Sequence, residues 1–277
     1  MHKPAVHLFH IGYSMETMAM LAPGFQFLDN LDNERPDWFE SWPIRDYLNK
    51  HVLDEDAYYG FFSPRFFLKT GRTANDLREF IALQEPGVEA FIVCPQAEVG
   101  AFFLNPVYGM DFADAGALNT TQKLLDKSGM DLNVSTMLID STELSYSNYV
   151  IGKPSYWRRW LELVECAYRF ADGDEDAELK KELNKPTAYN QGVQRKVFFI
   201  ECVPTLVFHH HQLKVKSIPV NQELAGKGIM YPYVEKANQC DALKNAFRRT
   251  GEFQYMQDFQ QLANTVLSNF ARSTPAD

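Results

Sequence analysis

The chain alternates short apolar runs with amphipathic stretches through its first 220 residues. The short runs are rich in β-branched and aromatic residues and are bounded by turn-forming residues such as Gly12, Pro64 and Gly87. This pattern is typical of strands buried in a sheet. The predicted strands lie at 6–11, 25–28, 57–63, 88–93, 137–139, 148–151 and 213–220.

The longer stretches between these runs predict helices. Trp157, Trp160, Val164 and Tyr168 recur at helical spacing, and Pro154 stands at the start, where its missing N–H costs little. The stretch 193–208 is apolar on all sides, so we expect a buried helix there. The predicted helices lie at 44–51, after an N-cap at Thr73, and at 113–127, 157–168, 193–208, 234–249 and 252–271.

The order of these elements predicts an α/β fold. We expect a single domain with a mostly parallel mixed central sheet flanked by helices. Residues 1–220 would form this domain, and residues 221–277 a helical extension packed on it. Ligands in such folds bind at the carboxyl ends of the strands. The loops after Ile11, Phe62 and Val93 are therefore the first places to look for a site.

Composition narrows the classes of protein. The 277 residues carry 27 basic and 36 acidic side chains, a net charge of −9, which disfavours binding to nucleic acid without excluding it as an acceptor. The four cysteines form no CxxC pair and read as reduced thiols, so we expect a cytoplasmic protein. No apolar run reaches the roughly 18 residues of a membrane span, and the N-terminus lacks a signal-peptide pattern.

The histidine triplet at 209–211 invites a metal-site interpretation. In an extended segment His209 and His211 would share one face, but no further ligand cluster accompanies them. We prefer to place the triplet at the polar C-terminal end of a buried helix, where a cationic imidazole suits the helix dipole. A metal-dependent hydrolase that uses His209 and His211 with an acid stays an alternative. The usual Walker A, GxGxxG, HExxH and GxSxG patterns are absent from the sequence.

One carboxylate stands in an otherwise apolar run, at Glu201. Burial of an isolated carboxylate is costly unless it is paired or hydrogen-bonded. One interpretation is a structural ion pair with Arg195 or Lys69. The other is a catalytic base or a ligand of substrate hydroxyls, since desolvation raises the pKa of a carboxyl group towards neutrality.

Two further segments carry polar chemistry. Arg65 and Lys69 follow the strand 57–63, where two cations are suited to hold a diphosphate. Asn148 and Tyr149 precede a buried strand and offer an amide, a hydroxyl and an aromatic ring, which are the contacts that sugars use. Each segment also fits an interpretation without a ligand. The segment with Arg65 and Lys69 could be an ordinary solvated loop, and the segment with Asn148 and Tyr149 a polar strand edge.

Three segments in this order resemble one group of proteins: YYGFFSPRFFLKTG at 58–71, NYVIGKPSYWRRWLELVE at 148–165, and QRKVFFIECVPTLVFHHHQLKVKSIPV at 194–220. The chain resembles bacterial glycosyltransferase-like proteins of capsule and surface-polysaccharide loci, which have a GT-A-type fold. That group carries the patterns (F/Y)xGxxSxxF, NYxVxxxxFWxxYL, FxxERLxxxxL and KVKxxP. The resemblance consists of scattered short motifs within about residues 40–220.

The resemblance implies a glycosyltransferase that moves a sugar from a nucleotide-sugar donor to a carbohydrate or other hydroxyl acceptor. It maps the helix acid onto Glu201, which would be the catalytic base. The implied acceptor-binding residues are Asn148 and Tyr149. The implied donor-binding residues are Gly12, Tyr13, Ser14, Ser63, Arg65 and Lys69.

The sequence also departs from the group's patterns. Cys202 stands where arginine follows the helix acid, and Pro204 falls within the predicted helix. The Asp-x-Asp pair that holds a divalent ion in many GT-A enzymes is absent after the strand 88–93, where Glu98 is the nearby acid, and Asp111 and Asp114 have the wrong spacing. We therefore assign no metal ligand and no certain cofactor, and leave Mg²⁺ or Mn²⁺ open. A non-catalytic carbohydrate- or nucleotide-binding assembly protein with the same fold is the alternative.

Overall fold

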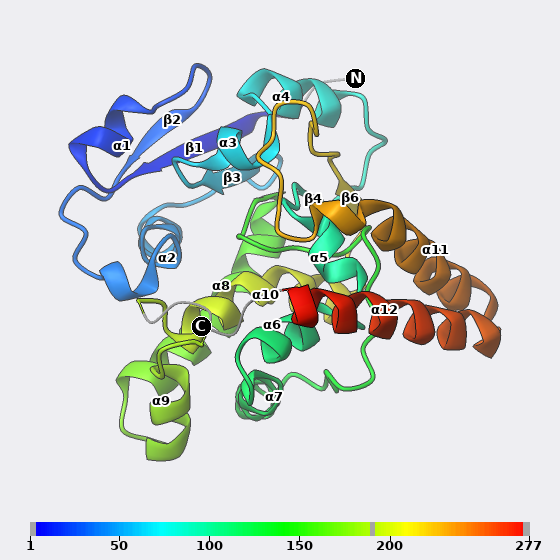
Figure 1. The fold of residues 1–277 in the computed structure, drawn as a ribbon. Coiled ribbons are helices and arrows are strands. Elements are labelled where there is room, and N and C mark those ends of the chain that lie inside the picture. Colours follow the sequence, from blue (N-terminus) through cyan, green and yellow to red (C-terminus); the bar gives the residue numbers. More distant parts are fainter. Residues whose placement is uncertain (1–3, 189–191, 274–277) are drawn as a thin grey trace.

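A computed structural model describes residues 4–188 and 192–273. The predicted α/β class is confirmed: a mixed sheet of six strands is flanked by helices (Figure 1). The strand order is β2-β1-β3-β5-β4-β6. The strands are β1 (Val6–Gly12), β2 (Gln26–Asp29), β3 (Tyr58–Phe62), β4 (Ala90–Ile92), β5 (Val150–Gly152) and β6 (Val215–Ser217).

The sheet is mostly parallel, as predicted. β1 pairs in parallel with β2 and β3, and β4 pairs in parallel with β6. β5 lies between β3 and β4 and is antiparallel to both. The other five strands therefore point in one direction, and the amino end of β5 meets their carboxyl ends at one edge of the sheet.

The two faces of the sheet are buried by alternating residues, as a pleated strand requires. In β3, Tyr59 and Phe61 enter one core cluster, whereas Tyr58 and Phe62 enter the other. The first cluster packs against α2 (Ser41–Lys50), α8 (Pro154–Asp172) and α10 (Arg195–His211), and the second against α3 (Phe66–Thr70) and α4 (Ala74–Ala82).

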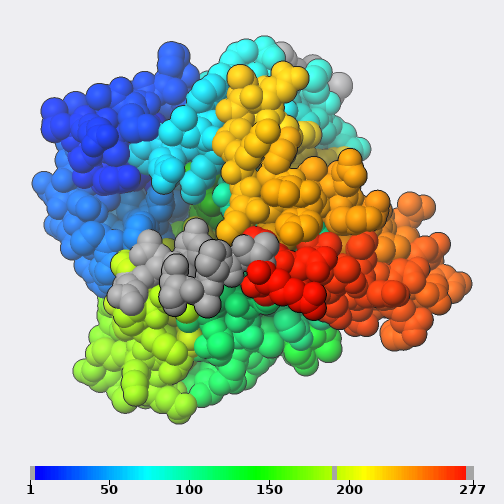
Figure 2. Space-filling view, in the orientation of Figure 1, coloured from blue at the N-terminus to red at the C-terminus, as the bar shows by residue number. Residues whose placement is uncertain are grey.

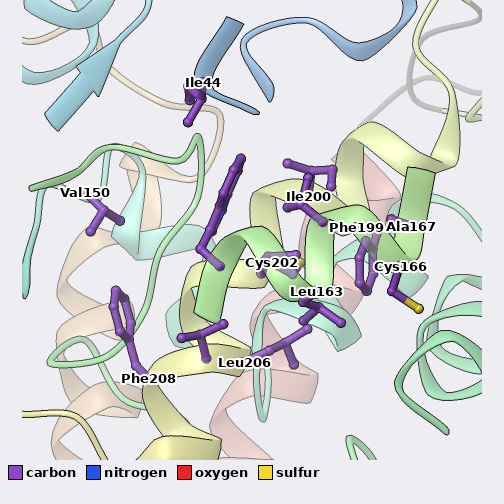
Figure 3. Packing of buried hydrophobic residues seen from close by; sticks show 14 of the residues in the cluster. Ile44, Val150, Leu163, Cys166, Ala167, Phe199, Ile200, Cys202, Leu206 and Phe208 are labelled. Atoms are coloured by element: carbon purple, nitrogen blue, oxygen red, sulfur yellow. The ribbon is translucent and has the colours of Figure 1, made fainter. Parts of the chain in front are cut away.

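The helix α10 is central to the larger cluster. Figure 3 shows Phe199, Ile200, Leu206 and other α10 residues among side chains of α8, such as Leu163. The prediction of a buried helix here is confirmed, and Pro204 lies inside α10 without ending it. The helix positions Glu201 beneath the sheet.

The remaining helices complete the layers. They are α1 (Met15–Ala19), α5 (Ala97–Ala101), α6 (Pro106–Ala113), α7 (Ala117–Ser128), α9 (Ala177–Leu183), α11 (Val234–Thr250) and α12 (Phe253–Ser273), with short 3₁₀ turns at Pro36–Trp38 and Tyr231–Tyr233. Figure 1 shows α11 and α12 side by side at the end of the chain. They pack on α5 through a cluster that includes Phe102, Cys240 and Phe259. None of the described helices is long and apolar enough to cross a membrane.

One local prediction is wrong, and one helix begins later than predicted. Residues 137–139 form no strand, because Asn105 donates hydrogen bonds to the carbonyls of Val134 and Met137 and holds this segment as an irregular loop. The helix predicted at 113–127 is confirmed as α7, which begins at Ala117. A turn separates it from α6, and Asp111 stabilises this turn by accepting from the backbone of Gly116 and Leu118.

Candidate active site

Most of the predicted site residues come together at the edge where the parallel strands end. Gly12 closes β1, Ser63 follows β3, and Tyr149 immediately precedes the antiparallel β5. Ser63 and Tyr149 are joined by a 2.5 Å hydrogen bond between their hydroxyl oxygens. The topology therefore joins segments that lie 86 residues apart in the chain.

The two predicted cations border this edge. Arg65 is exposed just before α3, and Lys69 is partly buried within it. The Lys69 ammonium lies 5.6 Å from the centre of the Tyr149 ring. The positive charge of Arg65 acts on the hydroxyls of both Tyr13 and Tyr149. Arg65, Lys69, Tyr13 and Tyr149 thus share one neighbourhood.

Glu201 faces the same neighbourhood from below. Its side chain is half-buried: it keeps some solvent contact, although many protein atoms surround the carboxyl group. Burial raises the pKa of Glu201 to about 7, an effect that the positive charge of Lys69 opposes and the negative charge of Glu40 increases. Among the described residues, no hydrogen bond or ion pair occupies this carboxylate.

The ion pair expected between Glu201 and Arg195 does not form. Arg195, at the start of α10, is buried and pairs instead with Asp114 at 2.6 Å and with Glu182. This pairing also explains Asp114, which is used in the core rather than in a metal site. The other suggested partner, Lys69, acts on Glu201 through its charge.

Glu40 is a site residue that the sequence did not reveal. Burial raises the pKa of Tyr13, Tyr149 and Glu201, and the negative charge of Glu40 adds to the increase at each of these three groups. The preceding residue, Phe39, has a left-handed backbone (φ 48°), so a tight turn directs the chain here. The direction of the strands was a signal for Glu40, because the loop after β2 begins at the same edge of the sheet as the loops after β1 and β3.

The three predicted donor-binding residues at the end of β1 and in the loop after it, Gly12, Tyr13 and Ser14, have different surroundings. The Tyr13 ring is exposed (40%) and available to a ligand. The Ser14 hydroxyl instead accepts from the backbone of Thr17 and forms a capping box at the start of α1. Gly12 leaves room for the Phe27 ring, since a Cβ atom at this position would overlap with that ring.

The segment before β5 contains strained backbone. Ser147 and Asn148 both have positive φ (71° and 53°), which L residues rarely adopt. Asn148 is buried, and its Oδ1 has no hydrogen-bond partner among the described residues. Strain and an unpaired polar atom in one residue are typical of ligand-binding segments. Tyr149 differs, because its hydroxyl is bonded to Ser63 and its ring is buried.

The end of β4 carries a single acid near the site. Burial raises the pKa of Glu98, at the start of α5. The segment after β6 covers it, since a Cβ atom at Gly228 would lie 2.5 Å from a carboxylate oxygen of Glu98. Within residues 4–188 and 192–273, no three His, Cys, Asp or Glu side chains are grouped to hold a metal ion.

The histidine triplet ends α10, as expected from the sequence. His209 lies 3.3 Å from Glu143, and His210 contacts His211 ring to ring. A groove of about 570 Å³ borders His210 and His211 between α7 and α8. Arg159 in this groove faces Glu89, which precedes β4, so the groove lies at the opposite edge of the sheet from Glu201.

Figure 2 shows a hollow on this face of the molecule, between the blue and cyan N-terminal segments and the gold segment after β6, with green atoms at its floor. No protein-family model, curated protein or solved structure matches the chain. The site is therefore interpreted from its own geometry: two cations, an enclosed carboxylate and exposed aromatic surface at the carboxyl ends of parallel strands.

Proposed function

We propose that the chain is a glycosyltransferase of GT-A-like fold that moves a sugar from a nucleotide-sugar donor to a hydroxyl acceptor, in polysaccharide or glycoconjugate synthesis. The observation that supports it best is Glu201, an enclosed carboxylate with a pKa of about 7, set beside Lys69. A base for hydroxyl groups works best when its pKa lies near the working pH.

In the proposed reaction the acceptor hydroxyl loses its proton to the Glu201 carboxylate. The acceptor oxygen forms a bond to the anomeric carbon, and the bond from that carbon to the donor phosphate breaks in line. The nucleoside diphosphate leaves with the electron pair. In-line displacement inverts the anomeric centre.

Arg65 and Lys69 would hold the leaving diphosphate, because both cations lie near Tyr149 on the approach to Glu201. The exposed ring of Tyr13 offers a stacking surface for the nucleotide base. The unpaired Oδ1 of Asn148 is suited to accept a hydrogen bond from an acceptor hydroxyl. Glu98 is the carboxylate that follows the end of β4. Assays with and without a chelator test whether transfer depends on Mg²⁺ or Mn²⁺.

The first prediction concerns Glu201→Gln. The variant should bind donor as the unaltered chain does, but its rate of transfer should fall by about 10²–10⁴-fold, the usual contribution of a general base. Calorimetry with UDP-, GDP-, CMP- and TDP-sugars measures binding, and product formation with varied acceptors measures transfer. Glu162→Gln, which changes an acid of the opposite groove, is the matched control and should keep full activity.

Full turnover in Glu201→Gln would remove this residue from the reaction. Binding of nucleotide sugars by the unaltered chain, with neither transfer nor hydrolysis, would contradict the enzyme proposal. That result would favour a carbohydrate- or nucleotide-binding assembly protein.

A further inference from the structure

An amphipathic surface lies beside the candidate site, on α3 and on the segment 219–230 that follows β6. Four apolar side chains are exposed there: Phe67 (42%), Leu68 (54%), Leu224 (58%) and Ile229 (62%). Exposed apolar side chains that gather in one place mark a binding surface more often than scattered ones do. We call these four residues, with Arg72 and Lys227, the α3 patch.

Backbone contacts hold the two parts of the patch together. Gly226 donates to the carbonyl of Leu68 at 2.8 Å, and Asn221 donates to that of Thr70 at 2.9 Å. The Arg72 side chain donates to the carbonyl of Pro219 at 2.7 Å. In Figure 2 the gold atoms of this segment lie against cyan atoms of the N-terminal half. These contacts place α3 and the first part of the segment after β6 side by side.

The charge of α3 and its flanking residues is opposite to that of the whole chain. Residues 64–72 contain Arg65, Lys69 and Arg72 and no acid, a net charge of +3, whereas the chain carries −9. The segment 219–230 adds Lys227 and Glu223, which cancel. Cations thus border the exposed apolar side chains.

We propose that the α3 patch docks the protein on an anionic lipid bilayer. A bilayer offers both partners that the patch requires, phosphate groups for the cations and an apolar interior for the side chains. The chain as a whole carries a charge of −9 and is repelled by an anionic surface, which favours contact through this locally cationic face. Lys69 belongs both to α3 and to the surroundings of Glu201, so docking brings the candidate site to the lipid surface.

The test is sedimentation of the full chain with vesicles of phosphatidylcholine, with and without about one third phosphatidylglycerol. The unaltered chain should bind the anionic vesicles, more weakly at high salt and on pure phosphatidylcholine. Phe67→Ser with Leu68→Ser should reduce binding about tenfold or more, because both side chains lose their apolar contact with lipid. The control, Val52→Ser with Leu83→Ser, changes two apolar residues outside the patch that are even more exposed, and it should bind unchanged.

Three results would overturn the proposal: no binding of the unaltered chain to vesicles, equal loss in the control, or full binding by the Phe67 and Leu68 double variant. Size-exclusion chromatography with light scattering tests whether a second copy of the chain, rather than lipid, binds to the patch. Self-association that the double variant abolishes, without vesicle binding, would assign the patch to a second copy of the chain. The assay uses no nucleotide sugar, so its result is independent of the proposed transfer reaction.

Discussion

Glu201 connects chemistry with stability at the level of a single residue. Its pKa of about 7 in the folded protein exceeds the ordinary 4.5, so the folded state holds a proton that the unfolded state has released between these pH values. The contribution of Glu201 to stability is therefore highest below about pH 4.5 and falls as the pH rises to about 7. The ionised Glu201 carboxylate lowers the stability of the fold near neutral pH, and a catalytic role for this ionised form would explain why an acid stands here.

The second prediction follows from this linkage. Glu201→Gln should be more stable than the unaltered chain at pH 8, by up to about 3 kcal/mol, and should show no gain near pH 4. Urea denaturation at both pH values measures the difference. A Gln variant that is less stable at pH 8 would show that the ionised carboxylate is stabilised in the fold, as a structural partner would do.

The sequence predicted Glu201 but missed Glu40, and the reason is physical. A carboxylate within an apolar run is conspicuous because its burial has a cost. Glu40 lies in a polar loop, where acids are ordinary, and only the turn at Phe39 and the sheet topology bring it near Glu201. The positive φ angles of Ser147 and Asn148 could not be predicted from the sequence either, which singled out only the polar side chain of Asn148.

At the scale of elements, α10 is fixed by a buried ion pair at its first residue. Arg195 and Asp114 are both almost fully buried, with 1% and 3% of their side chains exposed. The guanidinium also donates to Thr120 and to the carbonyl of Ala115. This network ties α10 to the turn between α6 and α7 and so sets the position of the helix that carries Glu201.

The third prediction is that Arg195→Met destabilises the protein by about 3–5 kcal/mol, because Asp114 is left buried without its partner. Adding Asp114→Asn should recover part of the loss. Arg158→Met is the control: its pair with Glu55 is exposed, so its removal should cost less than about 1 kcal/mol. Urea denaturation of the three variants and the unaltered chain tests this, and equal losses in the Arg195 and Arg158 variants would contradict it.

Long elements were predictable where their periodicity was strong. The N-cap at Thr73 is confirmed with a full capping box, and Pro154 occupies the start of α8. The strand predicted at 137–139 was wrong because a short apolar run has no periodicity of its own. Its conformation depends on hydrogen bonds from the Asn105 amide, which lies 29 or more residues away in the chain.

At the scale of the whole molecule, the position of the candidate site follows from the direction of the strands. Alternating helices and strands predicted that the loops after β1 and β3 would meet, and they do. The antiparallel β5 was not predicted, and it brings Asn148 and Tyr149 to the same edge from the amino end of their strand. Strand direction depends on pairing between distant residues, which a local pattern does not encode.

The most direct test of the account is a ¹³C NMR titration of the glutamate carboxyl groups, with Glu201→Gln to assign the Glu201 signal. Glu201 should titrate with a midpoint near pH 7 that rises when UDP or GDP is added, because the diphosphate offsets the positive charge of Lys69. A midpoint near the ordinary 4.5, or one that no nucleoside diphosphate changes, would contradict a desolvated base beside a diphosphate site.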